Sequence, residues 1–291
     1  MKMNRLIMIV SILCIAVGAS AKKNREYPRA LIKVGYNYHY LGMRNDGEIT
    51  VHDYDYLLLA NPECSKYYSH NNEYLDSLES TPQGRKLHNQ LMTIGVEQYL
   101  KNGDDSAIPR YKGKVYVFKS LKDGITTVYD TYGLGEQGYY DEPFSEIEWV
   151  IADSTKNLLG YDCVMAETDY HGRHWTAWFA PEISLQDGPW KLSGLPGLIL
   201  EAVDSTGQHS FIATGIEKSD QEMYPVYNAE KYDKMNRIDM LKAYAAYCEN
   251  IGSYSRAMIM DTPGGSKIEM SAPNPQKANI RKIDFLETDY H

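Results

Sequence analysis

The segment LLGYDCVMAETDYHGRHWTAWF, residues 158–179, decides the fold class. Apolar and polar side chains alternate on both sides of its central HGR, and such alternation is typical of strands with one buried face. Glycine permits the positive φ angle that a tight β-hairpin requires. The segment therefore predicts two antiparallel strands, 158–170 and 175–179, that fold back on each other at Gly172.

Other alternating runs, separated by short turns that contain glycine, extend this pattern in both directions. They are residues 31–40 and 49–59, 114–118 and 125–129, 198–203 and 210–217, with a further strand at 147–152. Strands and helices do not alternate regularly, so the strands should form an antiparallel meander rather than a parallel sheet. The segment GLGEQGYYDEP, residues 133–143, is expected to be a loop.

Two helices are expected beside the sheet. The first opens at Thr81-Pro82 and ends at Asn102-Gly103, and the second starts at an Asn228 cap and runs for about twenty residues. The predicted fold class is thus mainly β (α+β): an antiparallel meander sheet, open or curled into a half-barrel, with two or three helices packed on it. A single β-rich domain should cover residues 22–291, with a loosely ordered C-terminal tail from about residue 261.

Residues 1–21 predict a secretory signal peptide. Lys2 and Arg5 precede an apolar run, and Ala19-Ser20-Ala21 supplies the small residues of a cleavage site. The apolar run is shorter than the roughly 20 residues that span a bilayer, which favours cleavage near Ala21 over a retained transmembrane anchor. The mature chain is therefore expected in the periplasm or outside the cell.

The composition excludes some partners and is neutral about others. Of the 291 residues, 43% are hydrophobic, which is enough for a packed core, and the formal net charge is −9. Nucleic-acid binding rests on clustered Lys and Arg, so DNA and RNA are excluded as expected partners. The 25 Tyr far outnumber the 5 Phe and 4 Trp. Tyrosine has an apolar ring with a polar tip and suits half-buried strands and wet binding surfaces.

Three cysteines, Cys64, Cys163 and Cys248, remain after the predicted cleavage. An exported protein can form disulfides, and the sequence leaves open any one of three pairings or three separate thiols. The chain has no C-x-x-C, which disfavours a redox centre or a clustered zinc site. It also has no P-loop and no dinucleotide-binding glycine motif, so no cofactor is predicted.

Residues 149–217 resemble the GLPGLI family of exported proteins of Gram-negative bacteria. The family hexapeptide stands here at 194–199, and the likeness extends to Gly160-Tyr161-x-Cys163, Gly172-Arg173-x-Trp175, Trp178-Phe179 and Gly188-Pro189. The resemblance implies export but carries no established reaction or cofactor. The order of strands and helices also resembles the half-barrel of envelope lipid carriers, as an analogy of fold alone.

The family segment supplies the candidate binding residues, Trp190, Lys191, Leu195 and Trp178. Proline and glycine around Trp190 define a rigid, sharply bent approach to the next strand. Two interpretations follow: the bend packs Trp190 and Leu195 over the sheet, or it places Trp190 and Lys191 on the rim of a ligand groove. We expect the first: an ordered loop, Gly188 to Gly197, with Trp190 largely buried against the sheet.

Candidate catalytic and metal-binding groups gather around the central hairpin. His171 and His174, with Glu167 and Asp169 nearby, are weak metal candidates, because no further ligands follow at ordinary zinc spacing. Surface imidazoles at a turn are the simpler interpretation. A thiol nucleophile at Cys163 is disfavoured because a cysteine in a strand is usually a buried apolar group, and no G-x-S-x-G elbow occurs.

The pentapeptide Glu-Thr-Asp-Tyr-His occurs at 167–171 and again at 287–291. Either the duplication is chance, or both copies fill similar environments at exposed strand ends. Taken together, the sequence favours an exported envelope protein that binds a lipid, a peptide or another envelope protein without catalysing a reaction. The alternative is an envelope hydrolase or a metal-binding protein that uses the 163–174 hairpin.

Overall fold

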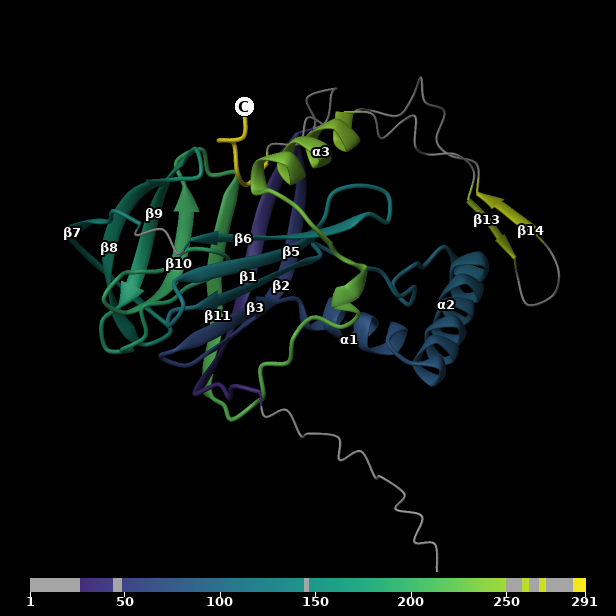
Figure 1. The fold of residues 1–291 in the computed structure, drawn as a ribbon, viewed down its shortest axis with the longest axis horizontal. Coiled ribbons are helices and arrows are strands. Elements are labelled where there is room, and N and C mark those ends of the chain that lie inside the picture. The colour runs from purple at the N-terminus through teal and green to yellow at the C-terminus, as the bar shows by residue number, and fades with distance from the viewer. Residues whose placement is uncertain (1–26, 44–48, 144–146, 250–257, 262–266, 271–284) are drawn as a thin grey trace, which may run out of the picture.

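The predicted hairpins join into one sheet of twelve strands (Figure 1). The structure is a computed structural model and describes residues 27–43, 49–143, 147–249, 258–261, 267–270 and 285–291. The predicted signal peptide, residues 1–21, lies outside the described residues. None of the helices in the described ranges is both long and apolar enough to cross a membrane.

The first half of the chain forms the sheet from its centre to one edge. In chain order the elements are β1 (Ile32–Met43), β2 (Ile49–Ala60), β3 (Cys64–Tyr68), β4 (Val115–Ser120), β5 (Ile125–Thr131) and β6 (Gln137–Pro143). Each pairs antiparallel with the next. At the edge, the short β12 (Asp233–Lys234) pairs parallel with β6.

The second half of the chain builds outward from the other side of β1. Its strands are β7 (Val150–Leu158), β8 (Tyr161–Tyr170), β9 (Arg173–Ala180), β10 (Leu198–Asp204) and β11 (His209–Lys218), all antiparallel, with β11 against β1. The hairpin predicted at Gly172 is confirmed. His171 and Gly172 have φ angles of 50° and 77°, the two positive values of a tight turn whose twist matches that of the flanking strands.

The sheet curls around its larger hydrophobic core (Figure 1). Alternate residues of β1, β2 and β8–β11 point to its inner side, and Trp175, Phe211 and Leu58 there are at most 1% exposed. Part of the outer side is covered by the segment after β11, where Met223, Val226 and Tyr232 pack on β2, β3 and β4. The expected fold class, a mainly β antiparallel meander with helices, is therefore confirmed.

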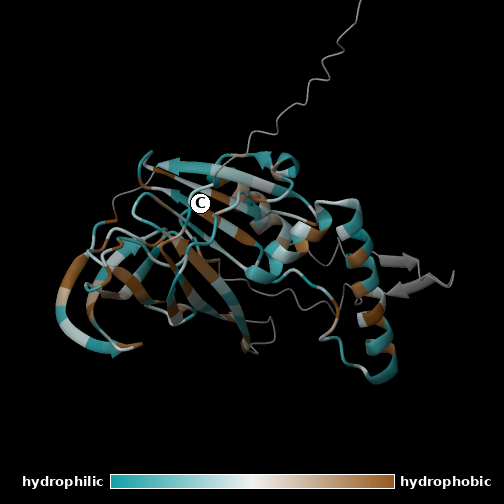
Figure 2. Ribbon diagram, turned by 90° about the horizontal axis from the view of Figure 1, so that it is seen from below, coloured by the Kyte–Doolittle hydropathy of each residue, from teal (hydrophilic) through white to brown (hydrophobic). Residues whose placement is uncertain are grey.

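Three α-helices accompany the sheet within the described residues. They are α1 (His70–Glu79), α2 (Pro82–Asn102) and α3 (Arg237–Glu249). The predicted ends of α2 are confirmed, because the Thr81 side chain accepts a hydrogen bond from Gly84 N and Gly103 adopts the left-handed conformation. α1 contacts β2, α3 contacts β6, and α2 packs on α1. Figure 2 shows apolar and hydrophilic residues mixed along α2.

Two expectations about individual elements are corrected. The segment 133–143 contains β6 because Tyr140 pairs with Val128 of β5 and is buried. Asn228 precedes only a short 3₁₀ turn (Ala229–Lys231), its side chain makes no capping hydrogen bond, and its φ of 54° lies outside the usual range for a cap. The helix starts later instead, where the Asn236 side chain accepts a hydrogen bond from Ile238 N at 2.9 Å.

The C-terminal segment was expected to be loosely ordered from about residue 261. Residues 262–266 and 271–284 lie outside the described residues, while β13 (Met258–Asp261) and β14 (Lys267–Met270) form a separate antiparallel pair. Residues 285–291 instead lie against the molecule, with Glu287 and Tyr290 buried. Cys64, Cys163 and Cys248 are three separate thiols, one of the arrangements that the sequence left open.

Candidate functional site

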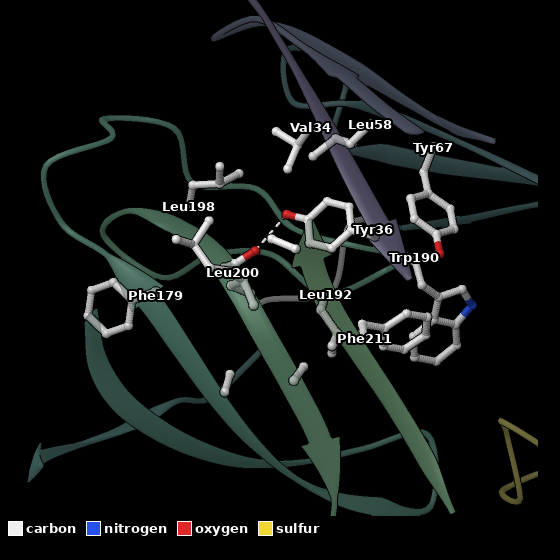
Figure 3. Close-up of a cluster of buried hydrophobic side chains, with 14 of the residues drawn as sticks. Val34, Tyr36, Leu58, Tyr67, Phe179, Trp190, Leu192, Leu198, Leu200 and Phe211 are labelled. Carbon is white, nitrogen blue, oxygen red and sulfur yellow. Dashed lines mark hydrogen bonds between the residues drawn. The ribbon is translucent and has the colours of Figure 1, made fainter. Parts of the chain in front are cut away.

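The loop between β9 and β10 fills the centre of the curled sheet. Its residues 181–197, all described, form no helix or strand, yet Trp190, Leu192 and Leu195 are at most 3% exposed. The Trp190 ring lies nearly parallel to Phe211, with 6.4 Å between centroids and 11° between planes, and Figure 3 shows the two side by side. The expected order of this loop and the burial of Trp190 are confirmed.

Buried polar contacts fasten the loop to the sheet. The Lys119 ammonium of β4 lies 2.5 Å from the Asp187 carboxylate and donates to the carbonyls of Gly188 and Leu192, at 2.9 and 3.1 Å. On the other side, the Tyr36 hydroxyl donates to the Ile199 carbonyl at 2.6 Å, the dashed line in Figure 3. Burial lowers the pKa of Lys119 and the neighbouring Asp187 opposes this shift. Lys119 thus holds the loop itself, and Tyr36 holds the start of β10, the strand that follows it.

Gly197, the second glycine of the hexapeptide, stands where a side chain has no room. A Cβ there would lie 2.3 Å from the carbonyl oxygen of Ala180 and 2.9 Å from Cα of Pro181. Ala180 ends β9, and Gly197 directly precedes β10. The two ends of the loop therefore touch, and glycine at this position allows the loop to close.

The predicted binding residues do not form a common rim. Leu195 is 1% exposed within the core, and Lys191 is 2% exposed. Trp178 is half-buried and lies on the other face of β9, where the Lys156 ammonium sits 4.4 Å from its ring centroid. Of these four candidates, Trp190 lines the large cavity described below, and the other three do not.

Lys191 lies at the centre of a buried network of charges. Its ammonium is 2.9 Å from Glu142 of β6 and 2.8 Å from Glu287 near the C-terminus. Arg237 of α3 also contacts Glu287 and lies 2.7 Å from Asp289. The network therefore ties the loop, the sheet, α3 and the last residues of the chain together.

The two copies of Glu-Thr-Asp-Tyr-His meet at this network. The first copy ends β8, and the second belongs to no strand. Thr288 N donates to the His171 carbonyl and its hydroxyl donates to the Gly172 carbonyl, both at 3.0 Å. The His171 ring nitrogen Nδ1 lies 3.2 Å from Asp289. The second copy thus binds the turn that follows the first, instead of occupying a similar strand end.

The two candidate metal-binding histidines belong to separate contacts. His174 points outward, where its Nδ1 lies 2.9 Å from Asp169. His171 faces Glu287 and Asp289, and one potential ligand atom from each of these three residues lies within 4.8 Å of the others. Arg237 already neutralises these carboxylates. Burial would raise the pKa of Asp289, but hydrogen bonds from Arg237 and His171 outweigh it and lower the pKa to about 2.

The structure does not bring Cys163 to the histidines. Cys163 is fully buried in β8, and burial raises the pKa of its thiol. It stands eight positions before His171 along the same extended chain, a separation of about 26 Å at about 3.3 Å per residue. The 163–174 hairpin therefore has no arrangement of thiolate and imidazole that would act as a nucleophile and base.

A cavity of about 690 Å³ occupies the end of the curled sheet that the loop leaves unfilled. Trp190 and Met240 of α3 line it, and its walls come from β1, β2, β4–β6, α1 and α3. Its aromatic lining is dominated by tyrosine: Tyr38, Tyr40, Tyr54, Tyr56, Tyr111, Tyr140, Tyr227 and Tyr244. Exposed Tyr111 and Lys231 lie where the cavity meets solvent.

Asp130 of β5 is a carboxylate in this cavity with an unusual environment. Its hydrogen bonds to described residues come from the neighbouring Thr131, whose N donates to it at 2.6 Å, and no described cation forms an ion pair with it. Burial is the largest influence and raises the pKa of Asp130 to about 7. Burial likewise raises the pKa of Tyr56 and Tyr140 beside it. The hydroxyls therefore remain protonated and can act as hydrogen-bond donors at neutral pH.

His209, the first residue of β11, also lines the cavity. It is 1% exposed, and its Nδ1 lies 2.6 Å from the Tyr38 hydroxyl. A sequence signal for this site exists in the alternating tyrosines of β1 and β2, because Tyr36, Tyr38, Tyr54 and Tyr56 must share one face of a hairpin. Nothing local to Asp130 marks it as part of the same site.

Known structures show weak likenesses to the chain. Two crystal forms of a protein described as PNGF-II match with TM-scores of 0.46 and 0.44 and identities of 12% and 13%, over 74% of this chain in both cases. This chain spans 33% of the length of each. A domain from Vibrio parahaemolyticus named for outer membrane lipoprotein sorting matches with a TM-score of 0.23 and 9% identity, over 68% of this chain and 90% of that domain.

Comparison of the sequence with known families gives a match for one part of the chain. No curated protein matches it in sequence. Residues 168–201, which run from the end of β8 through β9 and the central loop into β10, match a family described as "Protein of unknown function (Porph_ging)".

Proposed function

We propose that this chain is an exported binding protein that holds its ligand in the tyrosine-lined cavity without transforming it. The observation that supports this is the cavity itself, about 690 Å³ of space whose lining includes eight tyrosines, Trp190 and Phe285. A cavity of this size and lining is typical of sites for small ligands or peptide side chains. None of its described lining residues is a serine or cysteine that could serve as a nucleophile.

The lining favours a peptide over a lipid acyl chain. The Asp130 carboxylate in the wall would face hydrocarbon if an acyl chain filled the cavity, and polar groups without partners are costly to bury. A peptide offers N–H groups that can donate to this carboxylate while its side chains stack on the rings. We therefore assign a peptide, free or within another envelope protein, as the ligand class.

Export is part of this proposal. The charged start, short apolar run and Ala19-Ser20-Ala21 of the N-terminus support cleavage after Ala21, and the resemblance of residues 149–217 to the GLPGLI family agrees with it. The mature chain from Lys22 would then be one domain of the periplasm or the cell exterior. Mass spectrometry of the native protein is expected to find Lys22 as its first residue. Exported material with an intact Met1 would contradict the proposal.

The binding role can be tested with a neutral aromatic probe, N-phenyl-1-naphthylamine, whose fluorescence rises in apolar surroundings. We expect saturable binding to the wild-type mature chain. Leu241→Trp on α3 places a large ring at the cavity wall and should abolish binding. Lys242→Trp adds the same ring at the next, exposed position and should leave binding unchanged. Non-saturable binding, or equal binding by both variants, would contradict the proposal.

A further inference from the structure

We infer that the cavity recognises an organic cation, an ammonium or guanidinium group, with Asp130 as its counter-ion and tyrosine rings as its walls. This inference rests on the proposed binding function and names the chemistry of the ligand. Such a cation could be the side chain of a Lys or Arg in a peptide, or a free polyamine. The two sources share the same recognition chemistry and differ in what surrounds the charge.

The first support is the balance of charge among the groups that line the cavity. Asp76 lies 2.9 Å from the Lys114 ammonium, so its charge is compensated within the protein. Glu79 contacts the His88 ring, and Glu287 is compensated by Lys191. These carboxylates already have partners within the protein, so a cationic ligand would add little to their stabilisation.

Asp130 differs because its charge lacks such a partner among the described residues. The positive charge of Lys114 favours the charged form of Asp130, but the Lys114 ammonium is itself paired with Asp76. Glu287 acts in the opposite sense and disfavours the charged form of Asp130. A half-buried carboxylate without a paired cation is stabilised by any cation that enters the cavity, because the low local dielectric strengthens the attraction between the two charges.

The second support is the set of rings around Asp130. Tyr56 on β2, Tyr140 on β6 and Tyr244 on α3 line the same cavity as Asp130, so aromatic rings from three elements share the space with the carboxylate. The face of an aromatic ring carries partial negative charge and attracts ammonium and guanidinium groups. A carboxylate amid several aromatic rings is therefore a better site for an organic cation than for a neutral group.

The same geometry predicts how binding depends on pH. The titratable groups that interact electrostatically with Asp130 are Lys114, Glu287, Tyr56, Tyr140, Tyr232 and Tyr244. Burial raises the pKa of these tyrosines, so their hydroxyls stay protonated in the neutral range. Asp130 itself changes charge near pH 7 because burial raises its pKa. Affinity for a cation should therefore fall about tenfold for each pH unit below 7.

The test compares ligands that differ in one charge. Isothermal titration calorimetry at pH 8 would use the peptide acetyl-Ala-Lys-Ala-amide, its neutral counterpart with norleucine in place of Lys, and spermidine. We expect the Lys peptide or spermidine to bind at least tenfold more tightly than the norleucine peptide. Tighter binding of the Lys peptide would identify a peptide source, and tighter binding of spermidine a free polyamine.

Two variants test the role of Asp130. Asp130→Asn should reduce binding of the charged ligands to the level of the norleucine peptide, whereas Asp141→Asn, which removes an exposed carboxylate of β6, should not. Equal affinity for charged and neutral peptides in the wild type would overturn the inference, whatever the variant does. If the fluorescent probe still bound in that case, the binding function would stand; if neither probe nor peptide bound, both proposals would fail.

Discussion

Replacing Lys119 by methionine tests whether the central loop depends on its buried contacts. The substitution keeps the length of the side chain and removes the ammonium that contacts Asp187 and the carbonyls of Gly188 and Leu192. Both partners of the ion pair are at most 3% exposed, so the remaining carboxylate would stay buried without a cation. Loss of one partner of a buried pair costs about 3–5 kcal/mol.

We therefore expect Lys119→Met to lower the free energy of unfolding by about 4 kcal/mol and the melting temperature by roughly 8–16 °C. Urea denaturation followed by tryptophan fluorescence would measure this, since Trp175 and Trp190 are both buried in the core. Lys122→Met, at an exposed position in the turn after β4, is the matched control and should change stability by less than about 0.5 kcal/mol.

The double variant Lys119→Met/Asp187→Leu separates the ion pair from the packing around it. Because it leaves no buried charge unpaired, it should be about 2–3 kcal/mol more stable than the sum of the two single changes predicts. Additive effects, or a single variant as stable as the wild type, would refute the view that these contacts hold the loop.

Three further outcomes are expected. Trp190→Ala should lower the free energy of unfolding measured by urea denaturation by about 3–5 kcal/mol, the range for removing a large core aromatic. An unchanged melting temperature would contradict the role of Trp190 in the core. Gly172→Ala should raise hydrogen exchange at residues 287–289, because its Cβ would lie 2.3 Å from Thr288 Oγ1, whereas Gly124→Ala, also at positive φ but with open space around it, should not. Asp130 has a folded-state pKa raised to about 7, so its ionisation opposes folding: stability should decline between about pH 4 and pH 8, by at most about 4 kcal/mol, and Asp130→Asn should remove that decline. A wild-type stability that rises over this range and is unaffected by the variant would refute the assignment.

Local features of the sequence were sufficient to predict most of the sheet. Alternation of side chains and turn glycines such as Gly172 act within a few residues, so they mark hairpins reliably. The Thr81 cap and Gly103 likewise mark the ends of α2. β6 was missed because its glycine and acidic residues are typical of loops, and its strand character comes from pairing of Tyr140 with Val128.

The charged contacts and the cavity could not be predicted in the same way. Lys119 and Lys191 look like surface lysines in the sequence, and their burial depends on Asp187 and Glu287, which lie far along the chain. Asp130 becomes part of a site only because β2, β6 and α3 meet around it. Such properties arise from tertiary packing, and the sequence around each residue carries little trace of them.

The position of β1 in the middle of the sheet has a consequence for how the chain folds. β1 is the first strand of the sequence, but one of its two neighbours is β11, and the hydrogen bond from Tyr36 to Ile199 joins residues 163 positions apart. Folding rates fall as contacts span longer stretches of chain, because loop-closure entropy must be overcome first. β1 can pair with β2 early, but its pairing with β11 cannot form until residues 209–218 have been synthesised. If the chain is exported as proposed, this delay would keep it unfolded, and so competent for translocation, until it has crossed the membrane.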